Sequence, residues 1–277
     1  MKKTVRENNE AFPEVSFYIV AHADDWQLFM QPNAYKDIVS QKSEVVFIVT
    51  TAGDAGADET YWYSREEGMK SSIRLCLAPL GNIAETTGTC NFHGHIISYW
   101  SINNATCYFL RLPDGNLDSN GFVKYQHQSL FSFRTGNILS ITAVDNSTTY
   151  KNWNDFVSTL DQIIEIKSDG IFNKWINYLN PAEEINPHDH PDHICTGQAI
   201  QEMKVISSLK QVLFIGYSTA KDVAGLNSID LFWKSAMFAA YEKAVFDNSG
   251  YSTLREGIPV YLKWCLSSPK FNVIQAT

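Results

Sequence analysis

Two short polar clusters hold the side chains best suited to bind a metal ion. The first reads His22-Ala23-Asp24-Asp25, and the second, residues 188–193, reads His-Asp-His-Pro-Asp-His. Three of the 7 histidines of the chain lie within that second run, between carboxylates. Catalytic zinc usually takes three His or carboxylate ligands and keeps one position for water. The two clusters together therefore predict a zinc site.

The same clusters contain groups for acid–base chemistry. A bound zinc ion activates water and polarises a carbonyl oxygen, but hydrolysis also needs a base and a group that stabilises the developing charge. Asp24 and Asp25 are neighbours, so we expect one to bind the metal and the other to act as the base. Of His190 and His193, one can bind the metal while the other, oriented by a carboxylate such as Asp192, faces the substrate. This division of roles indicates a metal-dependent hydrolase.

The first cluster, taken alone, has a simpler explanation than metal binding. An Asp–Asp pair after a strand commonly caps a helix or forms a turn, and a single histidine after a strand is ambiguous. The histidine-rich run is harder to explain in this way, because a proline and two carboxylates separate its histidines. We therefore interpret the second cluster as a ligand loop.

The elements around the clusters predict an α/β fold. Residues 15–21 and 45–51 are apolar runs typical of buried strands, with room for a short helix at 33–41, and a helix is expected at 63–77. Alternating strands and helices favour a Rossmann-like, mostly parallel sheet with helices on both faces. Ligands bind such sheets beyond the carboxyl ends of the strands. The first cluster follows the strand at 15–21, and the second follows an expected strand at 175–179.

The rest of the chain predicts further elements of the same kind. Residues 95–112 read as one or two strands and 212–217 as another, with helices expected at 154–167, 193–207 and 228–245. No internal repeat or linker is visible, so we expect one domain over 1–277. Residues 81–150 include a polar stretch and are expected to contain an insertion or an edge hairpin.

Composition excludes several classes of function. The net charge is −8 with no basic stripe, which disfavours nucleic acid as a partner. No run approaches the roughly 20 apolar residues of a membrane span. The 5 cysteines are scattered without a CxxC pair, and the N-terminus lacks the apolar stretch of a signal peptide. These features predict a cytoplasmic protein with free thiols.

The motifs, taken in order, resemble those of the LmbE/PIG-L deacetylase family. That family has Ala-His-Pro-Asp-Asp-Glu after its first strand, which here reads Ala-His-Ala-Asp-Asp-Trp at 21–26, and His-Pro-Asp-His, which is intact at 190–193. Three further segments are similar: TTAGDAG at 50–56, the Arg-Glu-Glu helix that leads to LAPLG at 65–81, and RLPDGNLD at 111–118. The resemblance covers most of the chain.

The resemblance implies a zinc hydrolase that removes an acyl group, usually acetyl, from the nitrogen of an amino sugar or its conjugate. By motif position, His22, Asp25 and His193 would bind zinc, and Asp24 would be the general base. His190 would stabilise the oxyanion or protonate the leaving amine, with Asp192 orienting it, and Arg65 would contact the sugar. Another divalent transition metal would also fit these ligands.

Two departures from the family pattern stand beside the first motif. Ala23 replaces proline, and Trp26 replaces glutamate, which we expect to place a bulky ring beside the site. Two alternatives remain: an amidase that acts on a thiol, lipid or antibiotic conjugate, and a non-catalytic binding protein, which only Trp26 favours. The sequence leaves open whether the chain forms a homo-oligomer.

Overall fold

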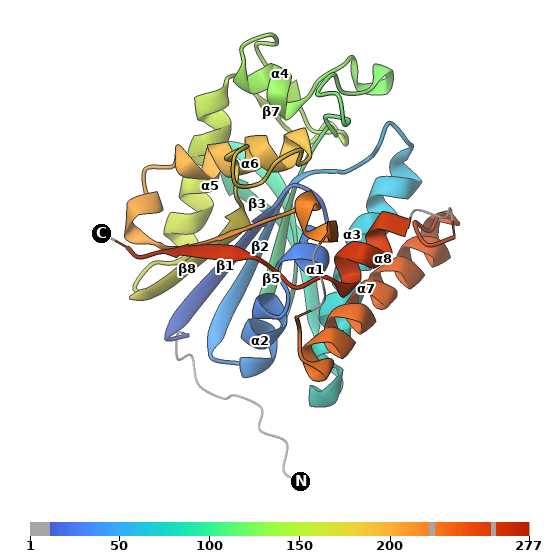
Figure 1. Cartoon of the computed structure of the whole chain (residues 1–277). Coiled ribbons are helices and arrows are strands. Elements are labelled where there is room, and N and C mark those ends of the chain that lie inside the picture. Colours follow the sequence, from blue (N-terminus) through green and yellow to red (C-terminus); the bar gives the residue numbers. More distant parts are fainter. Residues whose placement is uncertain (1–11, 222–224, 256–258, 277) are drawn as a thin grey trace.

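An eight-stranded sheet lies at the centre of the chain in the computed structural model, which describes residues 12–221, 225–255 and 259–276 (Figure 1). Its strands lie in the order β10-β9-β8-β1-β2-β5-β4-β3. Their bounds are β1 (Glu14–Val20), β2 (Ser43–Thr51), β3 (Glu85–Phe92), β4 (His95–Ile102), β5 (Ala105–Leu112), β8 (Asn173–Leu179), β9 (Lys210–Phe214) and β10 (Phe271–Ile274).

Five neighbouring strands of this sheet are parallel. β9, β8, β1, β2 and β5 pair in parallel, whereas β10, β4 and β3 add antiparallel strands at the two sides. The carboxyl ends of the five parallel strands therefore meet at one edge of the sheet. The chain continues from β1 to β2 on one side and returns to β8 on the other, so β1 and β8 flank the point where the direction of winding reverses.

Helices cover both faces of the sheet. On one face lie α1 (Asp25–Phe29), α2 (Asn33–Ser40), α3 (Glu59–Leu77), α7 (Ser228–Ser249) and α8 (Pro259–Leu266). On the other lie α4 (Leu130–Arg134), α5 (Trp153–Lys167) and α6 (Pro191–Gln201). The prediction of a mostly parallel α/β sheet with helices on both faces is confirmed.

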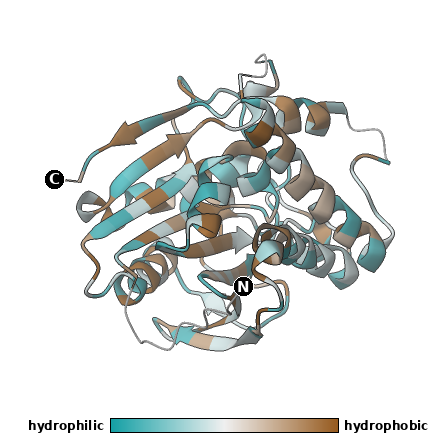
Figure 2. Cartoon of the chain, turned by 90° about the horizontal axis from the view of Figure 1, so that it is seen from below, coloured by the Kyte–Doolittle hydropathy of each residue, from teal (hydrophilic) through white to brown (hydrophobic). Residues whose placement is uncertain are grey.

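Strand β1 shows why the core has two layers. Its side chains alternate, so Phe17 and Ile19 pack in the core under α5 and α6 while Tyr18 and Val20 pack under α3 and α7. All four are at most 1% exposed, as expected for a central parallel strand covered on both faces. Viewed from below, hydrophobic and hydrophilic residues alternate along several strands and helices (Figure 2).

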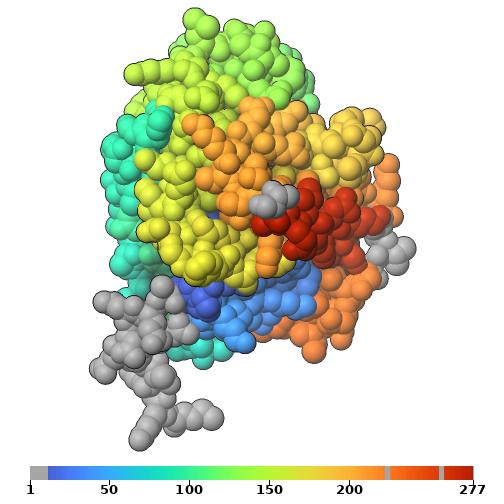
Figure 3. Space-filling view, turned by 90° about the vertical axis from the view of Figure 1, so that its left-hand side faces the viewer, coloured from blue at the N-terminus to red at the C-terminus, as the bar shows by residue number. Residues whose placement is uncertain are grey.

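Residues 81–150 form the far edge of the sheet and a cap above it. β3 and β4 make an antiparallel hairpin, and α5 covers this side beside it (Figure 3). The following stretch contains α4 and a separate two-stranded ribbon of β6 (Ile141–Thr142) and β7 (Thr149–Tyr150). Strand β3 is not among the strands predicted individually from the sequence. Its mostly exposed Thr, Asn and Gly residues show no regular alternation of apolar and polar side chains.

Several element ends differ from the sequence expectation for local reasons. α3 begins at Glu59 because the side chain of Asp58 accepts a hydrogen bond from the amide of Tyr61. The helix expected at 193–207 begins at Pro191, a favoured first helical residue, and ends at Gln201. Among the described residues, no helix has the length and apolar character needed to cross a bilayer.

Candidate metal centre

The two predicted clusters meet at the carboxyl edge of the sheet. His22 and Asp25 lie where the chain leaves β1 and enters α1, and His193 lies in the first turn of α6, after β8. Because β1 and β8 are neighbours in the sheet, residues 171 positions apart come into contact. The structure thus brings the three predicted metal ligands together.

Three donor atoms converge there. His22 Nδ1 lies 3.1 Å from His193 Nε2 and 3.6 Å from Asp25 Oδ1, and the last two atoms are 3.0 Å apart. All three residues are at most 5% exposed. A tetrahedral zinc ion with bonds of about 2.1 Å would hold its ligand atoms roughly 3.3 Å apart. The donor set therefore fits a divalent transition metal in both chemistry and spacing.

Asp25 is oriented for this arrangement by the backbone. Its Oδ2 accepts a hydrogen bond from the amide of His22 at 2.8 Å, which turns Oδ1 toward the two imidazoles. Burial alone would raise the pKa of Asp25, but His193 and His22 hold it well below its usual range. Burial opposes a charge on His22 as well, yet Asp25 and Asp192 raise its pKa to about 9. The carboxylates of Asp25 and Asp192 therefore favour positive charge among these buried side chains.

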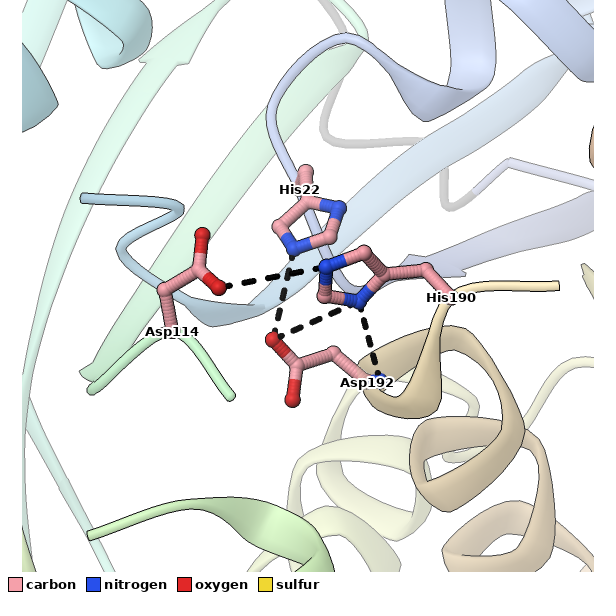
Figure 4. Close-up of side chains that lie close together, drawn as sticks. All are labelled: His22, Asp114, His190 and Asp192. Atoms are coloured by element: carbon pink, nitrogen blue, oxygen red, sulfur yellow. Dashed lines mark hydrogen bonds and ion pairs between the residues drawn. The ribbon is translucent and has the colours of Figure 1, made fainter. Parts of the chain in front are cut away.

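A second group of potential ligands shares His22 through the other nitrogen of its ring. His22 Nε2 is 3.4 Å from Asp192 Oδ2, and His190 Nε2 is 3.9 Å from Asp114 Oδ1 (Figure 4). His190 Nδ1 accepts a hydrogen bond from the backbone amide of Asp192 at 3.1 Å, so its lone pair is already used. This removes His190 as a ligand and leaves His22 Nε2, Asp114 and Asp192, whose Oδ2 already accepts a hydrogen bond from the amide of Gly115.

His190 caps the amino end of α6. Because its Nδ1 accepts from the helix backbone, the uncharged ring carries its proton on Nε2, the nitrogen near Asp114. Burial, helped by His22, lowers the pKa of His190 to about 4. The ring is thus a neutral hydrogen-bond donor that faces the cavity described below.

The carboxylate of Asp192 lies between two histidines. Its Oδ2 is 3.4 Å from His22 Nε2 and 3.8 Å from His190 Nδ1, and it accepts a hydrogen bond from Gly115 at 2.9 Å. Oδ1 is buried without a hydrogen-bond partner among the described residues. A Cβ atom at Gly115 would lie 2.5 Å from that oxygen, so only glycine lets the two loops approach this closely.

Asp24 lies two residues after the candidate ligand His22 and contacts Arg65 on α3. Arg65 Nη2 donates to Asp24 Oδ1 at 2.5 Å, and the other nitrogens of the guanidinium donate to Gly53 and Tyr241. Burial opposes the charge on Arg65, but Asp24 outweighs burial and raises the pKa of Arg65 well above its usual value, so the guanidinium stays charged. The predicted contact of Arg65 with a sugar stays a prediction.

A cavity of about 510 Å³ opens beside these groups. Its floor contains His22, Asp24, Asp25 and His190, and Arg65 and Asp114 lie in its wall. The remaining lining residues are mostly apolar or aromatic: Leu28, Phe29, Ala55, Tyr61, Leu117, Tyr217, Tyr251, Val260, Tyr261 and Trp264. The cavity can thus hold a small molecule against both the candidate metal ligands and an aromatic wall.

Sequence reasoning did not name several of these residues as site residues. Asp114 was noted only within the RLPDGNLD segment, although a carboxylate directly after a strand was a usable signal. Tyr217, Tyr261 and Trp264 come from η4 (Tyr217–Lys221) and α8, and no local pattern marks them. Tyr61, near the start of α3, also lines the cavity.

The prediction that the Trp26 ring lies beside the site is wrong. Its side chain is fully buried in the core under the sheet, with its ring 5.0 Å from that of Phe47, and it does not line the cavity. The first turn of α1 directs Asp25 to the ligand group and the next residue into the core. The loss of the family's glutamate therefore places no bulky ring beside the site.

The other histidines lie outside the ligand group. His188 is 91% exposed and lies 3.7 Å from Glu183, so it is a surface residue. His95 contacts Asp155 at 3.0 Å and Thr148 at 2.7 Å beside the β3–β4 hairpin. The sequence offered no sign of these partners, because they are more than 50 residues away from His95.

The fold is that of a Rossmann-like hydrolase, and the candidate metal ligands His22, Asp25 and His193 lie where the winding of the sheet changes direction. A family model described as PIG-L, GlcNAc-PI de-N-acetylase, matches residues 17–204. The chain belongs to this family, which confirms the predicted resemblance and the class of deacetylase enzyme. Both ligand clusters lie in the matched part, whereas Tyr217 and α8 lie beyond it. No curated protein sequence matches the chain.

Solved structures of similar fold share little sequence with this chain. N,N'-diacetylchitobiose deacetylase from Pyrococcus horikoshii, complexed with its inhibitor MPG, is 13% identical over 94% of this chain and 83% of that chain, with a TM-score of 0.47. A deacetylase of the teicoplanin biosynthesis pathway, in its bog complex, is 13% identical over 90% and 89%, with a TM-score of 0.47. GalB, the 4-carboxy-2-hydroxymuconate hydratase from Pseudomonas putida KT2440, is 8% identical over 95% and 96%, with a TM-score of 0.43.

Proposed function

We propose that this chain is a zinc-dependent hydrolase that removes an N-acyl group, in the first instance acetyl, from an amino sugar or a sugar conjugate. The observation that carries the proposal is the convergence of His22 Nδ1, Asp25 Oδ1 and His193 Nε2 at 3.0 to 3.6 Å from one another. The description of the family, a de-N-acetylase of a GlcNAc conjugate, supports the same reaction and substrate class.

His22, Asp25 and His193 would hold the zinc ion. When bound, zinc lowers the pKa of a coordinated water and polarises the carbonyl oxygen of the amide. The first group of ligands is favoured over the second because binding through His22 Nδ1 leaves Nε2 protonated and directed at Asp192 Oδ2. Asp192 would then support His22 with its carboxylate and His190 with its backbone amide.

Asp24 would be the general base. It lines the cavity next to the ligand Asp25, and Arg65 is the only donor to its side chain that the described part of the chain provides. That contact engages Oδ1 and leaves Oδ2 to accept a proton from the attacking water. The proton then passes from Asp24 to the amide nitrogen as the C–N bond breaks, so the product leaves as a neutral amine and Asp24 returns to its carboxylate form.

His190 would stabilise the oxyanion. Its Nε2–H points into the cavity from a ring held by the backbone of α6, so the donor needs no reorientation when charge develops on the carbonyl oxygen. Of the two roles implied by the family resemblance, the donor role is favoured because Nδ1 is occupied and the ring is neutral.

The cavity wall supports a sugar as the substrate. Asp114 and Arg65 offer polar contacts for hydroxyl groups on one side of the floor, and the rings of Tyr61 and Tyr261 offer flat surfaces for the C–H face of a pyranose. We further propose a reducing compartment, the cytoplasm, because all five cysteines are free thiols.

Metal content and acetate release test this function together. Wild type and His193→Ala are purified side by side, zinc per chain is measured by elemental analysis, and acetate released from N-acetylglucosamine and its glycosides is quantified. We expect about one zinc in the wild type, its loss in the variant, and acetate release by the wild type only. A wild type that binds no zinc after incubation with the ion would overturn the proposal and favour a binding protein.

A further inference from the structure

A buried carboxylate contacts the candidate ligand His193 on the side away from the metal group. Asp189 lies four residues before His193, in the loop that leads into α6, and its side chain is fully buried. Its Oδ1 is 2.9 Å from His193 Nδ1, whereas His193 Nε2 faces Asp25 and His22. The two ring nitrogens of His193 therefore have different partners on opposite sides.

Asp189 is itself held by two fixed donors. Asn186 Nδ2 donates to Asp189 Oδ2 at 2.5 Å, and the backbone amide of Tyr217 donates to Asp189 Oδ1 at 3.2 Å. The orientation of the Asn186 amide is also determined. Its Nδ2 donates to the carbonyl of Asn180, and its Oδ1 accepts from the amide of Gly216. Each oxygen of Asp189 can thus only accept.

The surroundings leave no room for Asp189 to move. A Cβ atom at Gly216 would lie 2.6 to 2.9 Å from all three atoms of the Asp189 carboxylate, so this position needs glycine. The carboxylate is packed between the end of β9 and the first turn of α6, where its Oδ1 contacts His193 Nδ1. No other carboxylate among the described residues contacts His193 Nδ1.

We propose that Asp189, anchored by Asn186, is the positioning residue that keeps the proton of His193 on Nδ1 and so presents the lone pair of Nε2 to the metal. A metal-bound imidazole that donates its other N–H to a carboxylate has a fixed ring and a more basic ligand nitrogen. The proposal rests on the proposed metal centre, but it concerns how tightly His193 binds the metal and through which ring nitrogen.

Asp189→Asn tests the role of the carboxylate while keeping its size. Asn186 Nδ2 donates to Oδ2 at 2.5 Å and the amide of Tyr217 to Oδ1 at 3.2 Å, so an amide at position 189 meets a donor on each side. The shorter contact should hold its oxygen toward Asn186, which, at the cost of the longer contact with Tyr217, turns its NH₂ toward His193 Nδ1. That nitrogen must then accept, which moves the ring proton to Nε2 and blocks the ligand position. We expect zinc affinity, measured by competition with a chelator, to fall about 10- to 100-fold.

Two further variants separate orientation from loss of a buried charge. Asp161→Asn is the matched control, because Asp161 is also buried and accepts hydrogen bonds from two amides, of Lys204 and Val205, away from the metal group. Its zinc affinity should equal that of the wild type. In the double variant Asp189→Asn with Asn186→Asp, residue 186 becomes an acceptor and the amide at 189 turns back. Part of the lost affinity should return, since the carbonyl of Asn180 loses its donor in the same change.

The outcomes are distinct. Wild-type affinity in Asp189→Asn, an equal loss in Asp161→Asn, or no recovery in the double variant would each overturn the positioning role. Nitrogen-15 NMR of the zinc-loaded protein supplies a second readout, in which His193 of the wild type should carry its proton on Nδ1. A wild type that binds no zinc would instead refute the proposed metal centre itself.

Discussion

The guanidinium group of Arg65 lies against the carboxylate of Asp24, with Nη2 2.5 Å from Oδ1. Nε of the same side chain donates to the hydroxyl of Tyr241 at 2.9 Å, and Nη1 donates to the carbonyl of Gly53 at 2.6 Å. The Arg65 guanidinium therefore links α3, α7 and the loop after β2 to Asp24, the proposed base. Its geometry makes Arg65 an orienting group for Asp24.

Arg65→Lys should reduce turnover without loss of metal. A lysine ammonium cannot reach three acceptors in the planar arrangement that the guanidinium satisfies. We expect kcat to fall about 100-fold, the cost of a misplacement of about 1 Å at a catalytic group. Zinc content should stay near one per chain, because Arg65 contacts none of the ligands. Tyr241→Phe, which removes one acceptor only, is the control, and an equal kcat in Arg65→Lys and wild type would contradict the orienting role.

Asp24→Asn should separate metal binding from catalysis. The amide retains the size of the carboxylate but cannot take a proton from water. Turnover is therefore expected to fall by about 10² to 10⁴-fold, the usual contribution of a general base. Elemental analysis should find the zinc content of the wild type. If turnover is unchanged while zinc is retained, another group must act as the base.

Zinc affinity should increase as the pH rises toward about 9. Burial opposes a proton on metal-free His22, but Asp25 and Asp192 raise its pKa to about 9, so below that pH the ring holds a proton that zinc must displace. Each displaced proton weakens the apparent affinity about tenfold per pH unit below the pKa. Chelator competition at several pH values below 9 measures this slope, and calorimetry in two buffers of different ionisation enthalpy measures the released protons. An affinity that does not change with pH would count against His22 as a ligand.

The convergence of the three proposed ligands could be predicted from the sequence because its signals are local. His22 and Asp25 follow an apolar strand directly, and His193 ends a histidine-rich run before a helix, so each is visible within six residues of chain. The parallel order of strands then places both loops at one edge. Asp189 lay within the same run, but its role depends on Asn186 and on the close approach of Gly216, which no local pattern shows.

The aromatic wall and the edges of the sheet could not be predicted in this way. Tyr217, Tyr251 and Tyr261 reach the cavity through the packing of elements that are distant in sequence from the ligand loops. Trp26 replaces a polar residue in the motif, but helical geometry turns it into the core. β3 is an edge strand of mostly exposed Thr, Gly and Asn residues, and β10 is an edge strand of only 4 residues, so neither shows the longer apolar run that identified the central strands.

The wall of the cavity is anchored by a buried lysine. Lys234 on α7 is 0% exposed, and its Nζ donates to the carbonyls of Trp264 and Ser267 at 2.7 and 2.8 Å. These carbonyls lie at the carboxyl end of α8, the helix that supplies Val260, Tyr261 and Trp264 to the cavity. Burial lowers the pKa of Lys234 to about 8, and its Nζ bridges the two carbonyls at this helix end.

Lys234→Met should therefore weaken substrate binding more than metal binding. The variant fills the same space but removes the lysine donor from the carbonyl of Ser267 and one of three donors from that of Trp264, which keeps the amide and hydroxyl of Ser267. An unsatisfied buried carbonyl costs about 1 to 3 kcal/mol. We expect a lower free energy of unfolding and a KM raised several-fold, because α8 loses its anchor, with zinc content unchanged. Lys243→Met is the matched control, since Lys243 lies on the same helix with a side chain 75% exposed and forms an ion pair with Asp247 on the surface. The control should match the wild type in both KM and unfolding. An unchanged KM in Lys234→Met would show that α8 holds its position without the lysine, and a loss of zinc would show that the effect reaches the ligands rather than the wall.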